Sequence, residues 1–579
     1  MISGKFILIL GAAATLTAGG CGSTQSKKGR FEAPPETEAI LVNQAGYPPG
    51  AEKVALIRAD AGKFEVIDAA TGKPVFKGTS GDPLYWELSG DTVRAADFSV
   101  LKTEGTYRIC LEDSEICSAP FRIGSDVYHE ITKASVKSYY LNRTAIEISE
   151  EYGGKWARPA GHPDTAVIVH SSAASKGRPA GTVISCPGGW YDAGDYNKYI
   201  VNSSITNYTL LLFCQMFPEY CRSLNLNIPE SRNEIPDLVD ELLWNLKWYL
   251  TMQDPDDGGV YHKLTNLNFC GFVMPHEATD PRYVVMKSTA ATLDFAAFTA
   301  MASRVFANDS SEELRTLAAT CLEASDKAMK WAEANPGILY RQPADISTGA
   351  YGDDNLSDEL FWAQAETALA HGTVPAEGFL EGITAGTPTW NQSGTLGLIS
   401  LALSTGEPFA SLREKASGLI VSYADQLLEK SAACPYRISL DHFAWGSTSD
   451  VANQAMLKII AMKITGSDRF LSSAQADLNW LLGTNPTGYC FVTGFGTLSP
   501  MHIHHRPSGA DGVPEPVPGF LVGGPNTVVM NDCQPPVKRS TFPARSYSDV
   551  ECSYSTNEIA INWNAPLVFL LGAFDSMRP

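Results

Sequence analysis

Two aspartates lie close together in a stretch rich in glycine and aromatic residues, residues 188–199. Asp192 and Asp195 are three residues apart, a spacing that lets two carboxylates act on one small molecule such as water. The glycines of the stretch favour a bend over a regular helix or strand. Its aromatic rings suit a sugar, whose C–H faces stack on rings while its hydroxyls bind carboxylates. The alternative is a surface turn whose aspartates bond their own backbone.

A second cluster of polar side chains ends a glycine-rich loop, residues 491–506. It contains His502, His504, His505 and Arg506. Adjacent residues such as His504 and His505 point apart, so the three histidines are poorly placed to bind one zinc ion. We interpret the cluster as an imidazole and a cation that bind sugar hydroxyls or orient a neighbouring carboxylate.

A third cluster, near the C-terminus, places Glu558 directly before an apolar run, residues 559–571. The run predicts a buried helix, so the carboxyl group lies at the edge of a core. Partial desolvation there raises the pKa of a carboxyl group, as a general acid at neutral pH requires. The alternative is a glutamate that, beside Asn557, stabilises the first turn of that helix.

The elements that must position these groups are mostly helices. Leu238, Leu242, Leu246 and Leu250 form one apolar stripe at helical spacing. Comparable stripes run through residues 288–306, 311–331, 358–370, 395–403, 416–428, 452–464 and 470–482. Long loops separate them, and loops of that length usually carry function. Residues 40–123 instead show short apolar or alternating runs between turns, which predict a small β-sandwich.

The three clusters resemble the active-site signatures of glycoside hydrolase family 9, whose members are mostly endoglucanases. The middle signature is matched by residues 504–506, and four further motifs follow in family order at residues 240–244, 257–262, 357–362 and 482–486. The C-terminal signature is matched at Tyr547, Asp549, Tyr554, Glu558, Ala560, Asn564 and Ala565. Residues 42–47 and 97–99 resemble the immunoglobulin-like domain found in one branch of the family.

The resemblance implies a multidomain fold and an inverting mechanism. It implies an immunoglobulin-like β-sandwich over residues 37–125, followed by an all-α catalytic (α/α)6 barrel over residues 126–579. Glu558 would be the general acid, Asp195 the general base, and Asp192 would hold the attacking water. Inversion needs about 6.5 to 9.5 Å between acid and base. A pair of aspartates and an acid far along the chain fits that arrangement.

The resemblance also implies a set of substrate-binding residues. His504 and Arg506 would bond the sugar near the cleavage point, and Asp549 would orient them or the sugar. We expect aromatic platforms among four side chains, each of which has burial in the core as its alternative: Trp190, Tyr196, Trp445 and Trp563.

Two structural metals are known in the family. The sequence has residues that match the calcium ligands but lacks the residue pair that holds zinc. Asp358 and Glu359 resemble ligands of the calcium site, and hard oxygen ligands suit that ion. The alternative is a pair of acids that stabilise the start of a helix. Relatives often hold zinc through a Cys-His pair, but this chain has Gly161 and His162 at the matching place. We therefore expect no zinc, and no cofactor is required for catalysis.

The N-terminus and the charge balance indicate an envelope protein that does not bind nucleic acid. The 579 residues carry a formal net charge of −20, which repels phosphate backbones but not neutral polysaccharide. Residues 1–21 resemble a lipoprotein signal peptide, because their apolar run is too short to span a bilayer and small residues precede Cys21. Residues 22–36 would be a flexible tether. Ordinary cleavage that leaves Cys21 unmodified is the alternative.

These observations predict a lipid-anchored protein of the bacterial cell envelope, on the outer membrane, the surface or the periplasmic face, whose only membrane contact is its anchor. Among twelve cysteines, Cys110 and Cys117 flank a turn and are placed for a disulfide. The expected activity is an inverting endo-β-1,4-glucanase that cleaves soluble or branched glucans such as xyloglucan or mixed-linkage glucan. The alternatives are an exo-acting β-glucosidase or glucosaminidase of the same family, and a non-catalytic glycan-binding lipoprotein.

Overall fold

The computed structural model describes residues 39–577. The predictions for the signal peptide, the tether and Cys21 lie outside the described residues. Within residues 39–577, no helix is both long enough and apolar enough to cross a membrane.

The N-terminal part of the described chain is a sandwich of two four-stranded sheets, as predicted. One sheet has the order β1-β2-β6-β5 and the other the order β4-β3-β7-β8, and the paired strands are antiparallel. The strands are β1 (Ile40–Leu41), β2 (Val54–Ile57), β3 (Lys63–Asp68), β4 (Pro74–Thr79), β5 (Leu84–Trp86), β6 (Asp91–Asp97), β7 (Gly105–Leu111) and β8 (Phe121–Ile123).

The inward-facing residues of the two sheets form a separate hydrophobic core. Tyr47 packs edge-on against Phe98 and Phe121 at centroid distances of 5.3 and 5.5 Å. Such edge-to-face contacts are favoured by the ring quadrupoles. Cys110 and Cys117 form a disulfide across the turn after β7, which confirms the predicted pairing. A second disulfide, which the sequence did not indicate, joins Cys533 to Cys552.

The rest of the described chain is mainly helical. The longer helices are α1 (His129–Leu141), α3 (Ile200–Met216), α5 (Asp237–Thr251), α6 (Thr289–Phe306), α7 (Glu312–Ala334), α8 (Ser357–His371), α9 (Gly394–Ala402), α10 (Ala410–Ala433), α11 (Ser447–Thr465), α12 (Leu471–Leu481) and α15 (Ile561–Ser576). The short ones are α2 (Glu150–Gly153), α4 (Pro218–Ser223), α13 (Arg506–Ala510) and α14 (Tyr554–Asn557), with 3-10 turns η1 (Gly154–Trp156), η2 (Ser171–Ala173), η3 (Glu407–Phe409), η4 (Asp468–Phe470) and η5 (Pro543–Arg545).

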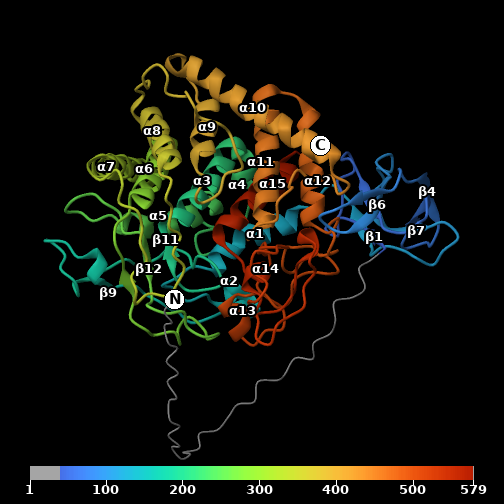
Figure 1. Ribbon diagram of the computed structural model, residues 1–579, viewed down its shortest axis with the longest axis horizontal. Helices are drawn as coiled ribbons and strands as arrows, with labels where there is room; N and C mark the ends of the chain where they lie inside the picture. The colour runs from blue at the N-terminus through green and yellow to red at the C-terminus, as the bar shows by residue number, and fades with distance from the viewer. Residues whose placement is uncertain (1–38, 578–579) are drawn as a thin grey trace, which may run out of the picture. The chain divides into compact units, whose positions relative to one another are not determined.

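The contacts between neighbouring helices, which are seen from the side in Figure 1, close a ring, and this is the predicted α/α barrel. Contacts pass from α3 to α6, α8, α9, α10 and α11, then to α15, which packs back against α3. Nearly all residues of α3, α6 and α15 are buried, because these helices are surrounded by other elements of the ring. Helix starts are set locally, since Ser288 and Ser311 accept hydrogen bonds from the amides of Ala291 and Leu314.

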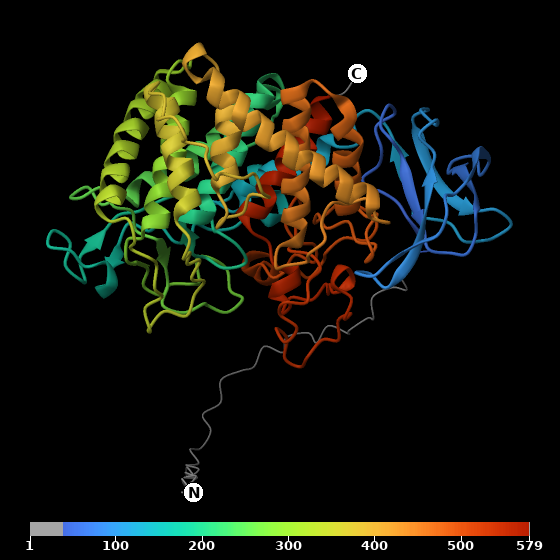
Figure 2. The same cartoon turned by 45° about the horizontal axis from the view of Figure 1, so that its top comes forward.

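A small sheet lies among the loops that connect the barrel helices. Its order is β10 (Val183–Ile184), β9 (Val167–Val169), β13 (Tyr283–Val284), β12 (Lys263–Thr265) and β11 (Lys198–Tyr199). Strand β11 begins three residues after Asp195 and leads directly into α3. The red segments that precede α15 gather at one end of the barrel helices in Figure 2. The loops therefore carry the predicted active-site residues on a helical frame.

Candidate active site

The turn that carries both aspartates is fixed by its glycines. Gly188 and Gly189 have φ values of +81° and +85°, a region that favours glycine. A side chain at Gly189 would also meet the ring of Trp248 at 2.9 Å. The turn is closed by the amide of Asp192, which donates to the carbonyl of Asn197 at 3.0 Å.

Asp192 is buried and held by neutral donors. Asn202 Nδ2 lies 3.0 Å from both carboxylate oxygens, and the hydroxyl of Tyr351 donates to Oδ2 at 3.2 Å. Burial, and then the charge of Asp195, raise the pKa of Asp192 well above its ordinary value. Charging both aspartates at once is therefore costly.

Asp195 has one occupied oxygen and one free oxygen. Its Oδ2 accepts hydrogen bonds from Asn197 Nδ2 and from the hydroxyl of Tyr199, the latter at 3.3 Å. Its Oδ1 has no hydrogen-bond partner within residues 39–577. A carboxylate fixed by one oxygen and free at the other suits a base that takes a proton from water.

Glu558 lies directly beside the aspartate turn, although it is more than 360 positions later in the sequence. The amide of Gly194 donates to Glu558 Oε1 at 3.2 Å, and the amide of Ile561 donates to the carbonyl of Asp192 at 2.8 Å. Glu558 is partly exposed, yet desolvation and then the charge of Asp195 raise its pKa well above the ordinary value. No hydrogen bond joins Glu558 to either aspartate within the described chain. A protonated acid beside a carboxylate base is the arrangement that glycoside cleavage needs.

His504 lies between the aspartate turn and Glu558. Its amide donates to the carbonyl of Asn557 at 2.8 Å, and its Nδ1 lies 2.7 Å from the carbonyl of Glu551. Since a carbonyl only accepts, Nδ1 carries the proton and Nε2 is left as an acceptor. Burial lowers the pKa of His504, which keeps the ring neutral. The imidazole is thus oriented to accept a hydrogen bond from a hydroxyl group.

Arg506 supports the aspartate turn through the carbonyl of Gly194. Its Nη1 donates to the carbonyl of Gly194 at 2.7 Å and its Nε to that of Cys270 at 3.0 Å. Its guanidinium also lies over the rings of Phe269 and Phe272. Nη1 and Nε thus bind backbone carbonyls of the protein. Arg506 therefore stabilises the aspartate turn, a role that the sequence did not predict.

Asp549 organises the loop around Glu558. Its oxygens accept hydrogen bonds from the amides of Met501 and His502 and from Asn557 Nδ2, all at 2.9 Å. The carboxylate therefore fixes both the loop that leads to His504 and the residue before Glu558. This geometry gives Asp549 an orienting role.

Two of the four predicted aromatic platforms are wrong. Trp190 is 1% exposed, its indole lies 3.3 Å from Glu241 Oε2, and its ring packs on Tyr139. Tyr196 is 2% exposed, and its hydroxyl donates to the carbonyl of Val273 at 2.6 Å. The turn directs these rings into the core, so neither ring face can contact a sugar.

The other two aromatic side chains remain accessible to different degrees. Trp445 is 43% exposed and lies 5.4 Å from the ring of Tyr554. Trp563 is partly buried, with its indole against Gly446 and Gly523. Trp445 and the partly exposed Tyr554, which precedes Glu558 by four residues, therefore form an accessible aromatic pair.

Sequence reasoning missed four residues that hold the two aspartates: Asn197, Tyr199, Asn202 and Tyr351. Three of them follow the aspartates at short spacing, which is a signal that could have been used. Tyr351 comes from a distant loop and has a φ of +49°, unusual for a residue with a side chain. Nothing in its local sequence marks it.

The residues at the predicted calcium site include buried carboxylate oxygens that have no hydrogen-bond partner in the described part of the chain. Both oxygens of Glu359, Oδ1 of Asp294 and Oδ2 of Asp353 accept no hydrogen bond within residues 39–577. Asp358 instead accepts from the amide of Ser393 at 2.7 Å and from Asn355. Burial and neighbouring acids raise the pKa of Glu359 to about 11.

Excess buried carboxylate of this kind suits a hard cation. In the part of the chain that the structure describes, no group of three or more His, Cys, Asp or Glu side chains is arranged to hold a metal ion by itself. A bound calcium would therefore need backbone carbonyl or water ligands as well. At the place of the family's zinc pair, His162 Nδ1 lies 2.9 Å from the hydroxyl of Tyr191.

Comparison with known families and proteins identifies relatives of this site. The family model described as glycosyl hydrolase family 9 matches residues 128–571, and that of the cellulase N-terminal ig-like domain matches residues 35–115. The chain is 42% identical to the xyloglucan-specific endo-β-1,4-glucanase of Bacteroides ovatus over 562 residues, 93% of this chain and 94% of the relative.

Solved structures agree with the sequence comparison. The structure of Bacteroides ovatus GH9 has a TM-score of 0.85 at 40% identity and covers 93% of this chain and 99% of its own. AaCel9A in complex with cellobiose-like isofagomine has a TM-score of 0.84 at 30% identity and covers 93% of this chain and 100% of its own.

Proposed function

Because the chain belongs to glycosyl hydrolase family 9 and is a glycoside hydrolase, we propose that it is an inverting endo-β-1,4-glucanase. Its favoured substrates are soluble or branched glucans such as xyloglucan or mixed-linkage glucan. The observation that carries this proposal is the contact between the Gly194 amide and Glu558, which brings an acid of raised pKa against the turn that carries Asp195.

Each step of the reaction follows from a contact in the site. Glu558, protonated because its pKa is raised, donates its proton to the glycosidic oxygen. Water attacks the anomeric carbon from the opposite face and gives its proton to the free Oδ1 of Asp195. Asp192, fixed by Asn202 and Tyr351, orients that water. His504 Nε2 accepts a hydrogen bond from a sugar hydroxyl.

Inversion is tested by the configuration of the first product. Proton NMR of a cello-oligosaccharide digest, recorded within minutes of mixing, should show the α-anomer before mutarotation. First appearance of the β-anomer would mean a retaining mechanism and would contradict the role of Asp195 as a base.

The substrate proposal draws on the relative from Bacteroides ovatus, which is named for its action on xyloglucan. Product size over time on xyloglucan, barley β-glucan and chitooligosaccharides tests it. A fall in viscosity before monosaccharide appears supports endo attack. Monosaccharide as the first product would indicate an exo-acting glycosidase instead, and activity only on chitooligosaccharides would indicate a glucosaminidase.

We propose that Cys21 anchors the protein to a membrane of the bacterial cell envelope, on the basis of the sequence alone. The anchored protein should partition into the detergent phase of Triton X-114 when expressed with its own signal. A Cys21→Ala variant should move to the aqueous phase. Equal partitioning of the two proteins would contradict the anchor.

A further inference from the structure

Lys263 is a fully buried lysine behind the aspartate turn. It lies on β12, opposite Tyr199 of β11, and has 0% exposure. Lys198 and Lys458, which are equally buried, pair with Asp164 and Asp477. For Lys263, no carboxylate of residues 39–577 lies within ion-pair distance. A buried ammonium without a directly paired anion is costly, so its surroundings should explain it.

The ammonium of Lys263 is bound by one loop. It donates to the carbonyl of Gly349 at 2.5 Å, to Thr348 Oγ1 at 2.9 Å and to Gln342 Oε1 at 3.2 Å. All three protons of the ammonium are thus used. The loop of residues 342–349 is thereby tied to β12.

The same loop supports Asp192. Tyr351 follows Gly349 by two residues and donates its hydroxyl to Asp192 Oδ2 at 3.2 Å. Its positive φ is a strained conformation that needs support from its neighbours. The anchored carbonyl of Gly349 and the edge contact between Tyr351 and Tyr199, at 4.7 Å, provide it.

A second series of hydrogen bonds leads from Lys263 to Asp195. Thr348 Oγ1, which the ammonium contacts, lies 2.7 Å from Thr265 Oγ1. The hydroxyl of Thr265 lies 3.1 Å from Asn197 Oδ1, and Asn197 Nδ2 donates to Asp195 Oδ2. One cation is therefore linked by short paths to both aspartates.

The charge of Asp195 also acts on Lys263. Burial lowers the pKa of Lys263 to about 7, while the negative charge of Asp195 opposes this effect. The titratable groups that face the ammonium are the phenols of Tyr199 and Tyr340, whose ring centroids lie 5.5 and 5.7 Å away. The adjacent imidazole of His262 is neutral, since burial lowers its pKa to about 3.

We propose that Lys263 is a positioning residue for the catalytic base: its ammonium fixes the loop that carries Tyr351 and, through Thr348, Thr265 and Asn197, the contact that holds Asp195. The proposal rests on the function proposed above. It assigns Lys263 no contact with substrate.

The test compares kcat and KM on xyloglucan for the wild type and Lys263→Met. Without the ammonium, the loop of residues 342–349 loses its attachment to β12, so Tyr351 and Asn197 should hold the two aspartates less firmly. We expect kcat to fall about tenfold, with KM changed less. A higher KM with an unchanged kcat would contradict the positioning role.

Two further variants distinguish a positioning role from a general loss of stability. Lys458→Met removes an equally buried lysine on α11 and should lower the melting temperature without lowering kcat. Thr348→Val keeps the ammonium of Lys263 but removes its link to Thr265, so it should lower kcat. Unchanged kcat in Thr348→Val would overturn the positioning role, even if Lys263→Met fails to fold.

Failure of this inference is distinguishable from failure of the proposed function. If Glu558→Gln loses hydrolysis while Lys263→Met keeps the wild-type kcat, only the role of Lys263 is wrong. If Glu558→Gln keeps full activity, the proposed function itself is wrong.

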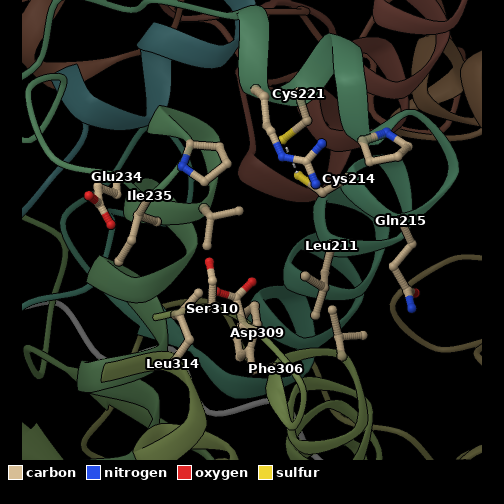
Figure 3. A pocket seen from close by; sticks show the side chains of 15 residues that line it. Leu211, Cys214, Gln215, Cys221, Glu234, Ile235, Phe306, Asp309, Ser310 and Leu314 are labelled. Carbon is tan, nitrogen blue, oxygen red and sulfur yellow. Dashed lines mark hydrogen bonds between the residues drawn. The ribbon is translucent and has the colours of Figure 1, made fainter. Parts of the chain in front are cut away.

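A separate observation concerns two cysteines without a recorded disulfide, Cys214 near the end of α3 and Cys221 on α4. Cys214 Sγ and Cys221 Sγ lie 2.7 Å apart beside a cavity lined by Leu211, Ile235 and Phe306 (Figure 3). Carbon atoms already touch at about 3.5 Å, and sulfur is larger. Two separate thiols therefore do not fit at this distance without repulsion.

We infer that Cys214 and Cys221 form a third disulfide in the protein. Cys110 and Cys117, seven residues apart in the same way, are already joined. The two thiols would lose two protons and two electrons to a thiol–disulfide oxidoreductase in its disulfide form, which is reduced to the dithiol. The bond would close the end of α3 onto α4.

Peptide mass analysis of the full chain, secreted into an oxidising compartment and unfolded without reductant in iodoacetamide, tests this bond. The peptides of Cys214 and Cys221 should appear linked, at two hydrogen masses below their sum. Cys214→Ala, Cys221→Ala and the double variant should lower the melting temperature equally. Alkylation of both cysteines in unreduced protein would overturn the inference.

Discussion

The backbone amide of Gly194 donates a hydrogen bond to the carboxyl group of Glu558 at 3.2 Å. This contact joins the aspartate turn to Glu558, which lies three residues before the start of α15. It places the acid of raised pKa next to the base without a direct hydrogen bond between their carboxyl groups. The geometry of the site therefore depends on the absence of a side chain at residue 194.

Substitution of Gly194 by alanine should damage catalysis. An added Cβ would overlap the carbonyl oxygen of His504 and lie 3.1 Å from Glu558 Oε1. The turn and the His504 loop must then separate, and a displacement of about 1 Å lowers rates by about 100-fold. Steady-state kcat on xyloglucan measures the loss. Gly337→Ala, where an added Cβ meets nothing, should keep wild-type kcat.

Substitution of Trp445 by alanine should weaken binding of long glucans. Its ring is exposed beside Tyr554 and can stack on a sugar. Loss of one stacking contact should raise KM about tenfold and change kcat little. Trp190→Phe serves as the control, because the buried Trp190 should affect the melting temperature and not KM. A KM effect in Trp190→Phe alone would contradict this division.

The pH profile should show an alkaline limb that belongs to Glu558. Its reactive form is protonated, so activity falls as pH rises through its pKa. Because that pKa is raised, the limb should lie well above the ordinary pKa of glutamate, about 4.3. The limb of kcat/KM should disappear in Glu558→Gln. Persistence of the same limb in that variant would assign it to another group.

We propose calcium as the ion that neutralises the acidic cluster around Glu359. Without an ion, the folded protein binds a proton at Glu359 more tightly than the unfolded chain, because its pKa is raised to about 11. That contribution to stability is present at low pH and declines as pH rises toward the raised pKa of Glu359, about 11. After treatment with EGTA, the melting temperature should fall between pH 5 and pH 9, and calcium should restore it.

The control for calcium is Glu359→Gln. This variant removes the buried charge, so its melting temperature should respond little to calcium or EGTA. A wild type that does not respond to either treatment would show that the carboxylates are neutralised by protons alone.

The sequence predicted the parts of the site in which the functional residues lie close together in the chain or stand beside a recognisable pattern of residue types. The Asp192–Asp195 turn, Glu558 before an apolar run and the His504 loop could each be found by their residue types. The helices followed from their apolar stripes, and the sandwich from its short runs. These patterns reflect burial on one face of an element, which a sequence records directly.

Other features depended on contacts between distant segments. Trp190 and Tyr196 resembled platforms because they flank the aspartates, but the turn directs their rings inward. Tyr351 contacts Asp192 from a distant loop, and Lys263 on β12 is linked to the aspartates only through other residues. No local pattern marks either of them. Their positions follow from the closure of the barrel, which only the structure specifies.

The most direct test of the central claim compares Glu558→Gln on two substrates. Cleavage of xyloglucan needs a proton on the leaving group, whereas 2,4-dinitrophenyl β-cellotrioside has a leaving group that does not. We predict that kcat on xyloglucan falls about 1,000-fold. On the dinitrophenyl glycoside it should stay within about tenfold of the wild type. Equal losses on both substrates, or no loss on xyloglucan, would contradict Glu558 as the general acid.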